Sequence, residues 1–592
     1  MRDPTVSRFA AARLSSQRRD ADLVRLAQET FDVLIIGGGV TGAGAALDAA
    51  SRGLSVVLVE ARDLASGTSS RSSKLIHGGL RYLEQLDFGL VYEALRERGL
   101  LATRLAPHLV RPLPFLVPLP VGAWPGPGLR AYYGAGVALY DAFAGLVGHR
   151  RGMPLHRHLS AAAAHRMFPS LREEAIGGAI RYHDAQVDDA RLVVTLARTA
   201  ASLGATIVTS ARAVEFRRSA REVTGASIED TESGRRIEVA ARTVIAATGV
   251  WSNDITEMLA AHGQAPVRAG LRVRTSKGVH IVVPRSAISG DAGLILRTER
   301  SVLFVIPWGG HWIVGTTDTD WNLDRTHPAA SASDIAYLLG QVNTVLDRPL
   351  STSDIEGVYA GLRPLLSGED ELSSSLSREH AVVEPMLGLM LVAGGKLTTY
   401  RVMAADVVDR AARRLDRSVP ASRTDQLPLL GADGYGRLWT NRADLARRHG
   451  VAAGAVEHLI ERYGSLSLEL LELLRAWPEL GRPLAGAPEY LAAEVSYAAR
   501  AEAALHLDDV LARRTRISFE TDHRGVESAA AAASLMGSVL GWDASRRARE
   551  IDYYLARVEA ERESQRMVDD LTADAARLGA PDVRSVAVHQ PG

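Results

Sequence analysis

The chain has 592 residues, of which 46% are hydrophobic and 23% charged, and its 69 basic and 69 acidic side chains give a formal net charge of zero. This length predicts two or more domains with sizeable cores, and the balanced charge carries no electrostatic sign of nucleic-acid binding. The absence of cysteine excludes disulfides, thiol catalysis, and zinc or iron–sulfur sites held by cysteine.

The N-terminal segment, residues 1–30, has no apolar core of the kind that a Sec-type signal peptide needs. Arg18 and Arg19 form a pair, but no hydrophobic stretch follows them, so a twin-arginine export signal is not expected. Nowhere does a run of about 18 apolar residues occur without charge or clustered glycine. We expect a chain without a spanning helix, in the cytoplasm or against the cytoplasmic face of the membrane.

A βαβ unit is predicted from "FDVLIIGGGVTGAGAALDAASRGLSVVLVEA". It contains a buried strand (Val33–Ile36), a glycine turn, an alanine-rich helix and a second strand (Ser55–Val59). Both strands are continuously apolar, which is typical of a parallel sheet covered on both faces.

The turn of this unit carries the pattern G-x-G-x-x-G at Gly37, Gly39 and Gly42, and Glu60 ends the second strand. The glycines allow a tight turn, close approach of a pyrophosphate and close helix packing, and the helix N-terminus attracts phosphate. An acid at the position of Glu60 binds ribose hydroxyls in such units. The combination predicts a dinucleotide site, and the pattern alone leaves FAD and NAD open.

Three further regions of strand are predicted downstream. One strand ends at Thr248-Gly249, residues 268–330 are rich in strand patterns with a hairpin turning near Gly309-Gly310, and a late strand ends at Gly394-Gly395 before a long helix. From about residue 425 the pattern becomes helical.

The helices expected in that region include Glu489–Arg514, Glu527–Leu540 and Ser545–Glu563, and residues 580–592 are expected to form a loose tail.

The order of these elements resembles FAD-containing proteins of the glycine-oxidase and D-amino-acid-oxidase superfamily, in which a β-sheet domain covers the flavin. Nine motifs sharpen the resemblance: "DLASGTSSRSSKLIHGGLRYLE", "VDDARLV", "ATGVWS", "KGVHIVVP", "FVIPW", "GTTDTD", "GLRPL" and "GGKLTTYR", with "ARRTR" near Arg513. In this order they are similar to FAD-dependent glycerol-3-phosphate dehydrogenases. The absence of cysteine fits the single-chain respiratory type of that family.

The resemblance implies an α/β fold with a Rossmann-like FAD-binding domain of the glycine-oxidase and D-amino-acid-oxidase type, a β-rich substrate domain and an all-helical C-terminal cap. The expected boundaries are an N-terminal extension (1–30), the oxidoreductase region (31–424, with the substrate domain at about 100–180 and 265–370), the helical domain (425–565) and a tail (566–592).

The resemblance also assigns site residues. The expected catalytic residues are His77, Arg81 and Arg363. The expected substrate-binding residues are Arg81, Tyr82, Arg363, Arg378 and Lys396. The expected FAD-binding residues are Gly37, Gly39, Gly42, Glu60, Thr68, Ser69, Ser73, Leu75, Thr248, Gly249, Gly395, Leu397 and Thr398.

These residue types suit glycerol 3-phosphate, because arginine and lysine bind a phosphate dianion and histidine titrates near neutral pH. His77 is the natural group to take the hydroxyl proton, and nearby arginines are expected to lower its pKa. The final proton acceptor stays open. Gly78 and Gly79 are expected to bring the backbone close to the flavin or the substrate.

Lys396 and Thr398 lie at a predicted helix start. The N–H groups of Leu397 and Thr398 would stabilise negative charge on a reduced flavin, or Thr398 or Thr399 would simply cap the helix.

The implied reaction is oxidation of glycerol 3-phosphate to dihydroxyacetone phosphate, with electrons passed from FAD to a membrane quinone. The stretch "RPLPFLVPLPVGAWPGPGLRAYYGAGVALYDAFAGL", with Arg130 among few charges, is either a membrane-surface contact or a buried part of the substrate domain. The family relation favours peripheral attachment, and a homodimer is compatible with it. Alternatives are a soluble oxidase that uses oxygen, a catalytically silent FAD sensor and an amine oxidase.

Four other polar residues receive structural interpretations. His183 is expected to stabilise a loop and His311 to lie on the surface. Asp318 and Asp320 are expected to anchor turns or salt bridges, and no metal site is predicted.

Overall fold

The structure is a computed structural model that describes residues 4–79, 87–119, 139–140, 153–219, 221–260, 271–298, 302–366 and 380–586. Three of the predicted site residues, Arg81, Tyr82 and Arg378, lie outside the described residues.

The first sheet has the strand order β17-β18-β10-β1-β2-β7, and β8 and β9 extend it beside β10. The pairs β18–β10, β10–β1, β1–β2 and β2–β7 are parallel. Its strands are β1 (Thr30–Ile36), β2 (Val56–Val59), β7 (Thr206–Val208), β8 (Ala211–Ser219), β9 (Glu222–Asp230), β10 (Arg236–Ala246), β17 (His380–Met386) and β18 (Leu389–Gly394). The predicted βαβ unit and the strand before Thr248 are confirmed.

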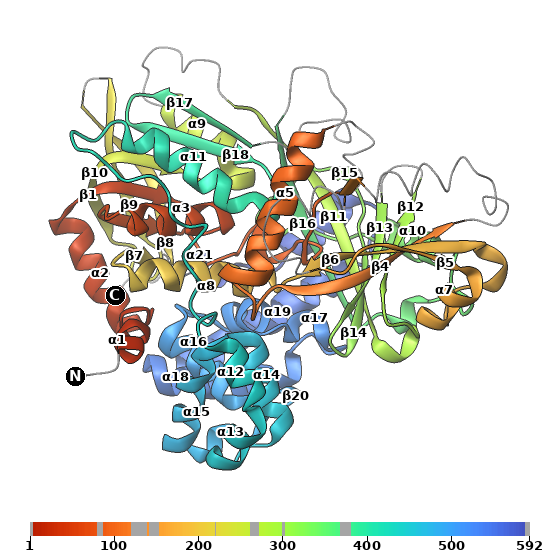
Figure 1. The fold of residues 1–592 in the computed structure, drawn as a ribbon. Helices are drawn as coiled ribbons and strands as arrows, with labels where there is room; N and C mark the ends of the chain where they lie inside the picture. The colour runs from red at the N-terminus through yellow and green to blue at the C-terminus, as the bar shows by residue number, and fades with distance from the viewer. Residues whose placement is uncertain are drawn as a thin grey trace.

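Helices cover this sheet as the apolar strands require. Helix α3 (Val40–Ser51) packs between α8 (Asp189–Ser202) and α11 (Tyr400–Ala412) (Figure 1). All four residues of β2 are buried, and residues 42–51 of α3 are buried as well. A parallel sheet with this central glycine turn places the turn at the carboxyl ends of β1 and β10, where ligands bind in such folds.

The second sheet has the order β15-β11-β14-β13-β12-β4-β6-β3, with β16 beside β11 and β5 beside β6. Its strands are β3 (Leu75–Ile76), β4 (Arg111–Leu119), β5 (Arg157–Ser160), β6 (Gly178–Gln186), β11 (Val273–Pro284), β12 (Gly293–Arg297), β13 (Val302–Trp308), β14 (His311–Gly315), β15 (Thr319–Asp320) and β16 (Gly357–Leu366). The predicted hairpin at Gly309-Gly310 is confirmed as β13–β14. His183 lies within β6, and its expected role in stabilising a loop stays a prediction.

This sheet has its own core, to which α10 (Ala332–Val342) contributes. Trp312 and Phe168 pack there with ring centroids 5.5 Å apart, and both are fully buried. The second sheet contacts the region of the first sheet where β3 packs beside η7 (Leu397–Thr399), the turn that follows β18. The two sheets thus meet around the segment that precedes His77.

The C-terminal region is helical apart from the small sheet of β19 (Pro483–Leu484) and β20 (Ala487–Leu491). Its helices are α12 (Tyr435–Thr440), α13 (Arg442–His449), α14 (Ala453–Tyr463), α15 (Ser467–Ala476), α16 (Ala492–Ala501), α17 (Ile517–Glu520), α18 (Val526–Leu540), α19 (Ala544–Ser564), α20 (Asp570–Leu578) and α21 (Val583–Val586).

Two sequence predictions for this region are wrong. A single helix over Glu489–Arg514 is interrupted after Ala501, where Ala503 takes a positive φ of 58°, and the chain resumes as the π-helix η10 (Asp509–Arg514). The expected loose tail is packed as far as residue 586, because the buried Arg584 binds both carboxylate oxygens of Asp509 at 2.9 and 3.0 Å. Long-range ion pairs of this kind leave no local pattern in the sequence.

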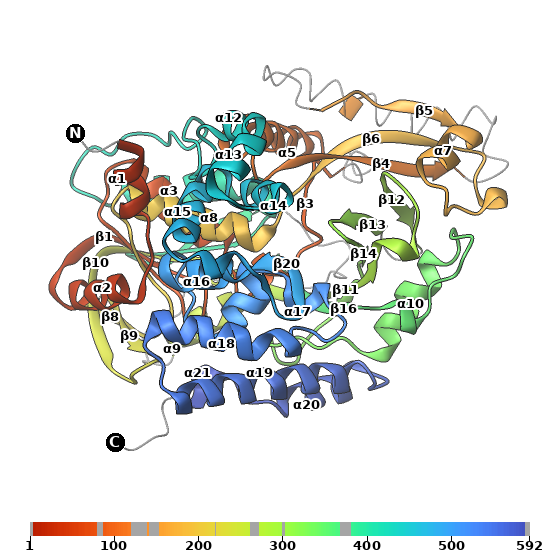
Figure 2. The ribbon, with the colours of Figure 1, turned by 90° about the horizontal axis from the view of Figure 1, so that it is seen from below.

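The N-terminal extension forms α1 (Pro4–Ala11) and α2 (Ser16–Gln28). Between them, the N–H of Leu14 donates to the carbonyl of Ala501 in the C-terminal region. Helix α2 lies against the first sheet, where Arg19 pairs with Asp230 at 2.5 Å. The extension therefore ties the two regions together (Figure 2).

The apolar stretch that begins at Arg111 opens with β4, in which Leu113 and Phe115 are buried in a core cluster. Most of the rest of the stretch, including Arg130, lies outside the described residues. Among the described helices, none has the length and apolar character needed to cross a membrane.

A buried carboxylate supports the C-terminal region. Glu494 is fully buried, and it accepts hydrogen bonds from the N–H of Leu491 at 2.9 Å and the hydroxyl of Tyr463 at 3.1 Å. Burial opposes its ionisation, but the charges and hydrogen bonds of His458, Arg462 and Leu491 outweigh burial and lower the pKa of Glu494 to about 2. Its ionised form is therefore favoured by folding.

We expect Glu494→Gln to lower the free energy of unfolding of the C-terminal region by roughly 3 kcal/mol at pH 7. Because the folded pKa lies below the ordinary value of 4.5, this contribution is present above pH 4.5 and is lost as the pH falls towards 2. Urea unfolding between pH 3 and 7 should show a steeper acid loss in the wild type than in the variant. Glu472→Gln, at an exposed position paired with Arg475, should behave as wild type; equal pH profiles for all three proteins would contradict the assignment.

Candidate active site

The glycine turn between β1 and α3 has no room for side chains at its glycine positions. Gly37 has a φ of +112°, and a Cβ there would lie 2.5 Å from the carbonyl oxygen of Ala247. A Cβ at Gly42 would lie 1.9 Å from the carbonyl oxygen of Gly37, and one at Gly39 would lie 3.2 Å from Ser69 Oγ. The turn therefore packs against the end of β10 and against the segment after β2, which brings Thr248 and Ser69 beside it.

Glu60 lies at the same edge, at the end of β2. One of its oxygens accepts the N–H of Gly38 at 2.6 Å, and the other accepts the N–H of Arg62 at 2.8 Å. Burial raises the pKa of Glu60, and these two N–H groups oppose that effect. The carboxylate is thus fixed beside the glycine turn, where its remaining lone pairs can accept ribose hydroxyls.

The segment after β2 connects the glycine turn with the second sheet. The hydroxyl of Ser69 accepts the N–H of Val40 at 2.9 Å, and the hydroxyl of Thr68 donates to the carbonyl of Leu362 in β16 at 2.6 Å. Ser73 Oγ lies 2.9 Å from Nε2 of His280 in β11. This segment therefore runs from the first sheet to the second, and hydrogen bonds to both regions fix its position.

A buried ion pair holds the same segment from the other side. Asp189, at the start of α8, accepts hydrogen bonds from the N–H and hydroxyl of Ser72 at 3.0 and 2.7 Å and from Nζ of Lys74 at 2.8 Å. Burial lowers the pKa of Lys74 to about 8, although Asp189 opposes that shift. Because both partners are fully buried, loss of one would leave an uncompensated charge in the interior.

His77 and Thr398 come together from opposite ends of the oxidoreductase region. The N–H of His77 donates to Thr398 Oγ1 at 3.1 Å, and that hydroxyl lies 3.2 Å from the carbonyl oxygen of His77. Thr399 occupies the predicted N-cap position of α11, but its side chain makes no capping hydrogen bond there, and Thr398 caps neither η7 nor α11. Thr398 instead attaches the loop of His77 to the turn that carries Lys396 and Leu397.

The structure gives Gly78 a packing role, and its expected approach to the flavin or the substrate stays a prediction. A Cβ on Gly78 would lie 2.6 Å from both Leu95 Cδ2 and the hydroxyl of Tyr140. Its N–H donates to Tyr140 at 2.9 Å, and Tyr140 donates to Asp184 at 2.6 Å. Gly78 is therefore small because protein side chains pack against it, and its neighbour Gly79 is buried with a φ of 73°.

Arg363 extends from β16 into a polar cluster on the second sheet. Its guanidinium donates to Asp318 Oδ1 at 3.3 Å, to Ser276 Oγ at 3.2 Å and to Thr316 Oγ1 at 3.0 Å. The expectation that Asp318 and Asp320 form salt bridges is confirmed, since Asp320 pairs with Arg274 at 3.0 Å. Arg363 keeps 24% of its side chain exposed, so its orientation is fixed while solvent still reaches it.

The described site thus consists of the glycine turn with Glu60, the connecting segment with Ser69, Ser73 and Leu75, the His77–Thr398 contact and Arg363. Thr248 and Gly249 begin the turn after β10, and Gly395 packs against Met403 and His380 just before Lys396. The roles of these residues in binding stay predictions, as do those of the three residues outside the described ranges.

Sequence reasoning missed several residues that shape the site. His280 is buried, stacks on Tyr359 with ring centroids 4.7 Å apart, and has its pKa lowered by burial and then by Arg363 and Lys74. Asp184 and Asp189 anchor the loops described above. His280 lies within "KGVHIVVP" and Asp189 within "VDDARLV", so a residue-by-residue reading of these motifs could have singled them out.

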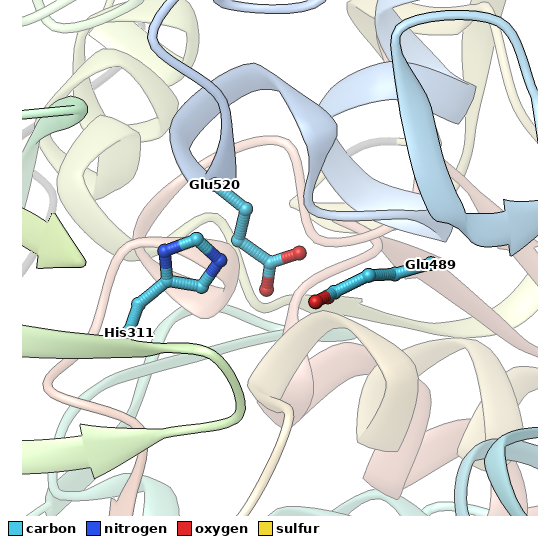
Figure 3. Close-up of side chains that lie close together, drawn as sticks. All are labelled: His311, Glu489 and Glu520. Carbon is cyan, nitrogen blue, oxygen red and sulfur yellow. The ribbon is translucent and has the colours of Figure 1, made fainter. Parts of the chain in front are cut away.

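A second polar cluster lies away from this site, between the β13–β14 hairpin and the C-terminal region. His311, Glu489 and Glu520 face one another there (Figure 3), with one potential ligand atom from each within 4.8 Å of the others. Nδ1 of His311 lies 2.8 Å from Glu356, and Glu520 accepts hydrogen bonds from Trp308 and Tyr490 at 2.6 Å each.

His311 is only 12% exposed, so its expected position on the surface is wrong. The cluster joins two regions of the molecule by hydrogen bonds.

The donor set at the glycine turn fits FAD. There is no room for a Cβ at Gly37 or Gly42. The N-cap residue of α3 is Gly39, so no side chain caps the helix, and the carboxylate of Glu60 lies beside the turn. Such a turn offers N–H groups to a pyrophosphate and an acceptor to a ribose.

Comparison with known proteins identifies the family. The family model described as "FAD dependent oxidoreductase" matches residues 32–401, more than half of the chain.

The chain belongs to the FAD-dependent oxidoreductase family. A second family model, described as "C-terminal domain of alpha-glycerophosphate oxidase", matches residues 422–547. The cofactor of this oxidoreductase is FAD, and the predicted fold class and family are confirmed.

Full-length relatives give a finer comparison. The oxidoreductase is 52% identical to glycerol-3-phosphate dehydrogenase 2 of Mycobacterium tuberculosis, over 98% of this chain and 96% of the relative. It is 35% identical to the mitochondrial glycerol-3-phosphate dehydrogenase of Rattus norvegicus, over 90% of this chain and 74% of the relative. The crystal structure of glycerol-3-phosphate dehydrogenase from Bacillus halodurans in complex with FAD is 27% identical, with a TM-score of 0.72 over 92% of this chain and 98% of that one.

Proposed function

We propose that the protein oxidises sn-glycerol 3-phosphate to dihydroxyacetone phosphate and passes the electrons to a membrane quinone. The choice of substrate rests on one observation, the match over nearly the whole chain to a relative named glycerol-3-phosphate dehydrogenase. The site supports the proposal, because it combines a dinucleotide turn, a histidine and a fixed arginine at the junction of two sheets.

The reaction removes two electrons and two protons from the C2 carbinol. Bound FAD supplies the acceptor for the hydride that leaves C2. His77 takes the proton of the C2 hydroxyl. The hydrogen bond from its backbone N–H to Thr398 fixes the backbone position from which the imidazole extends. Arg363 binds the phosphate, and its contacts with Asp318 and Thr316 hold the guanidinium in one orientation.

His77→Asn tests the proton-transfer step. Since both contacts of His77 with Thr398 use backbone atoms, the variant should keep the loop in place and retain FAD. We expect kcat to fall about 10²- to 10⁴-fold with a much smaller change in KM. Steady-state kinetics from pH 6 to 9 with a quinone-analogue dye measures both. A variant that keeps wild-type kcat and pH profile would exclude His77 as the base.

The acceptor is tested separately from the substrate. The reduced holoprotein should be reoxidised rapidly by a short-chain quinone, and slowly by oxygen without stoichiometric peroxide. Rapid reoxidation by air with one peroxide per turnover would favour the oxidase alternative instead.

Attachment to the cytoplasmic face of the inner membrane is part of the proposal and rests on the apolar stretch that begins at Arg111. Flotation with anionic phospholipid vesicles should carry the holoprotein upward. Protein that stays at the bottom of the gradient would contradict peripheral binding.

A further inference from the structure

A cavity lies outside the predicted FAD and substrate site, where the C-terminal helices meet the second sheet. It contains about 670 Å³ of space not filled by protein atoms, its open mouth included. Its walls come from Ser70 and Arg71 of the connecting segment, from residues 358–360 of β16, and from α19 and α20, which run side by side along one edge of the molecule (Figure 2). None of the predicted FAD or substrate residues that the structure describes lines it.

Four arginines line this cavity, together with the carboxylate of Glu561: Arg71, Arg513, Arg557 of α19 and Arg577 of α20. Arg513 is neutralised by Asp63 and Asp509 at 2.5 and 2.7 Å, which leaves the other three to consider. Within the described residues, Arg71 has no carboxylate within 4.0 Å, and it donates one hydrogen bond to the carbonyl of Thr326 at 3.3 Å. A half-buried guanidinium that has only a carbonyl partner among the described residues leaves most of its donors available to a ligand.

The other two arginines are only partly neutralised. Arg577 is 4% exposed, and its nearest carboxylate, Glu561, is 3.9 Å away and also pairs with Arg524 at 3.1 Å. Arg557 pairs with Asp508, but that carboxylate also accepts from Arg513 at 2.7 Å. The acids around the cavity are therefore shared among more arginines than they can neutralise one to one.

The electrostatics agree with this geometry. Burial first, and then the neighbouring arginines, lower the pKa of Arg71 and the pKa of Arg557 to about 9 each. His327 adds no positive charge, since burial and Arg62 lower its pKa well below the ordinary value. Like charges that line one cavity favour a bound anion, which would restore their ordinary ionisation.

We propose that this cavity binds a phosphate group, as inorganic phosphate or as part of a small phosphorylated molecule, between Arg71, Arg557 and Arg577. Guanidinium groups arranged around a concave site suit a tetrahedral oxyanion, to which each can donate two hydrogen bonds. The neutral His327 also lines the cavity, and its Nδ1 can donate or accept one more.

The site is connected to the flavin loop. Arg71 directly follows the segment in which Thr68 and Ser69 hold β16 and the glycine turn. Its carbonyl oxygen packs on Gly361, where a Cβ would lie 2.4 Å away, and Gly361 is two residues from Arg363. A bound phosphate therefore fastens α19 and α20 to the loop and strand that carry the proposed reaction.

Crystals of the FAD-loaded protein soaked in tungstate locate oxyanions directly by anomalous scattering. We expect a peak within hydrogen-bond distance of Arg71 and Arg577, in addition to any peak near Arg363. A peak near Arg363 alone, or no peak, would overturn the proposal.

Calorimetry with inorganic phosphate gives a second readout in solution. Arg71→Met should weaken the cavity-site Kd at least about tenfold, whereas Arg104→Met, at an exposed position on η2 (Leu101–Leu105), should leave it unchanged. Arg577→Met should reproduce the loss if Arg71→Met does not fold. Phosphate binding that is equal in all variants would contradict the site.

The same calorimetry compares the Kd of inorganic phosphate with that of 3-phosphoglycerate. Tighter binding of inorganic phosphate would identify the free ion as the ligand, and tighter binding of 3-phosphoglycerate would identify a small phosphorylated molecule. A failure of glycerol 3-phosphate to reduce the flavin would overturn the proposed function and leave the tungstate result unaffected.

Discussion

Gly42→Ala should yield a protein that purifies without yellow colour. The added Cβ would lie 1.9 Å from the carbonyl oxygen of Gly37, so α3 would have to move away from the turn that receives the pyrophosphate. Overpacking of this kind costs about 1–3 kcal/mol or more. Here the displaced atoms belong to the turn that binds the cofactor, so FAD binding is weakened. We expect FAD content below ~10% of wild type, measured by absorbance of the purified protein after heat release.

The matched control is Gly99→Ala in α5 (Phe88–Leu100). No atom of the described residues lies within 4 Å of a Cβ at that helical position, so FAD content should equal that of the wild type. A yellow Gly42→Ala protein with full FAD content would show that the turn does not hold the cofactor as described.

Arg363→Met should have the second large effect. Removing one arginine from a bound phosphate costs about 2–5 kcal/mol, which corresponds to a fall in kcat/KM of about 30- to 4,000-fold. FAD content should stay normal, because Arg363 contacts the second sheet rather than the glycine turn. Steady-state kinetics with glycerol 3-phosphate and a quinone-analogue dye gives the value.

Two further variants separate phosphate binding from simple loss of an ion pair. Arg363→Met leaves Asp318 buried without its arginine, so the double variant Arg363→Met with Asp318→Asn removes that stranded charge and should remain equally inactive. Arg274→Met breaks the exposed pair with Asp320 on the same sheet and should change kcat/KM less than about threefold. Recovery of activity in the double variant would show that Arg363 acts only through Asp318.

Local patterns were sufficient to predict much of the first sheet. The strand before Gly37, the helix after it and the strand before Glu60 are contiguous, and each carries its own burial signal. The hairpin at Gly309-Gly310 was predictable for the same reason. In each case the physical cause, a run of apolar residues bounded by glycine, lies within a few residues in the sequence.

Contacts between distant residues could not be predicted in this way. The helix expected over Glu489–Arg514 breaks where Ala503 donates its N–H to the carbonyl of Leu14, nearly 500 residues earlier in the chain. The packed C-terminal tail depends on Arg584 and Asp509, and the small size of Gly78 depends on Tyr140.

The candidate site shows the same division. The glycine turn and Glu60 could be placed from spacing alone, and the resemblance supplied His77, Arg363 and Thr398. The sequence could not reveal that Thr398 binds the backbone of His77 across 321 positions, or that Arg363 is fixed by Asp318. The first contact depends on the meeting of the two sheets, and the second depends on β15 and β16 lying on either side of β11 within the second sheet.

Anaerobic titration of the purified yellow protein with glycerol 3-phosphate tests the central claim most directly. We predict that the flavin absorbance bleaches with one equivalent of substrate per site, that dihydroxyacetone phosphate accumulates in the same amount, and that a quinone analogue restores the colour. A flavin that stays oxidised in excess glycerol 3-phosphate, in protein shown to be folded and loaded with FAD, would contradict the account.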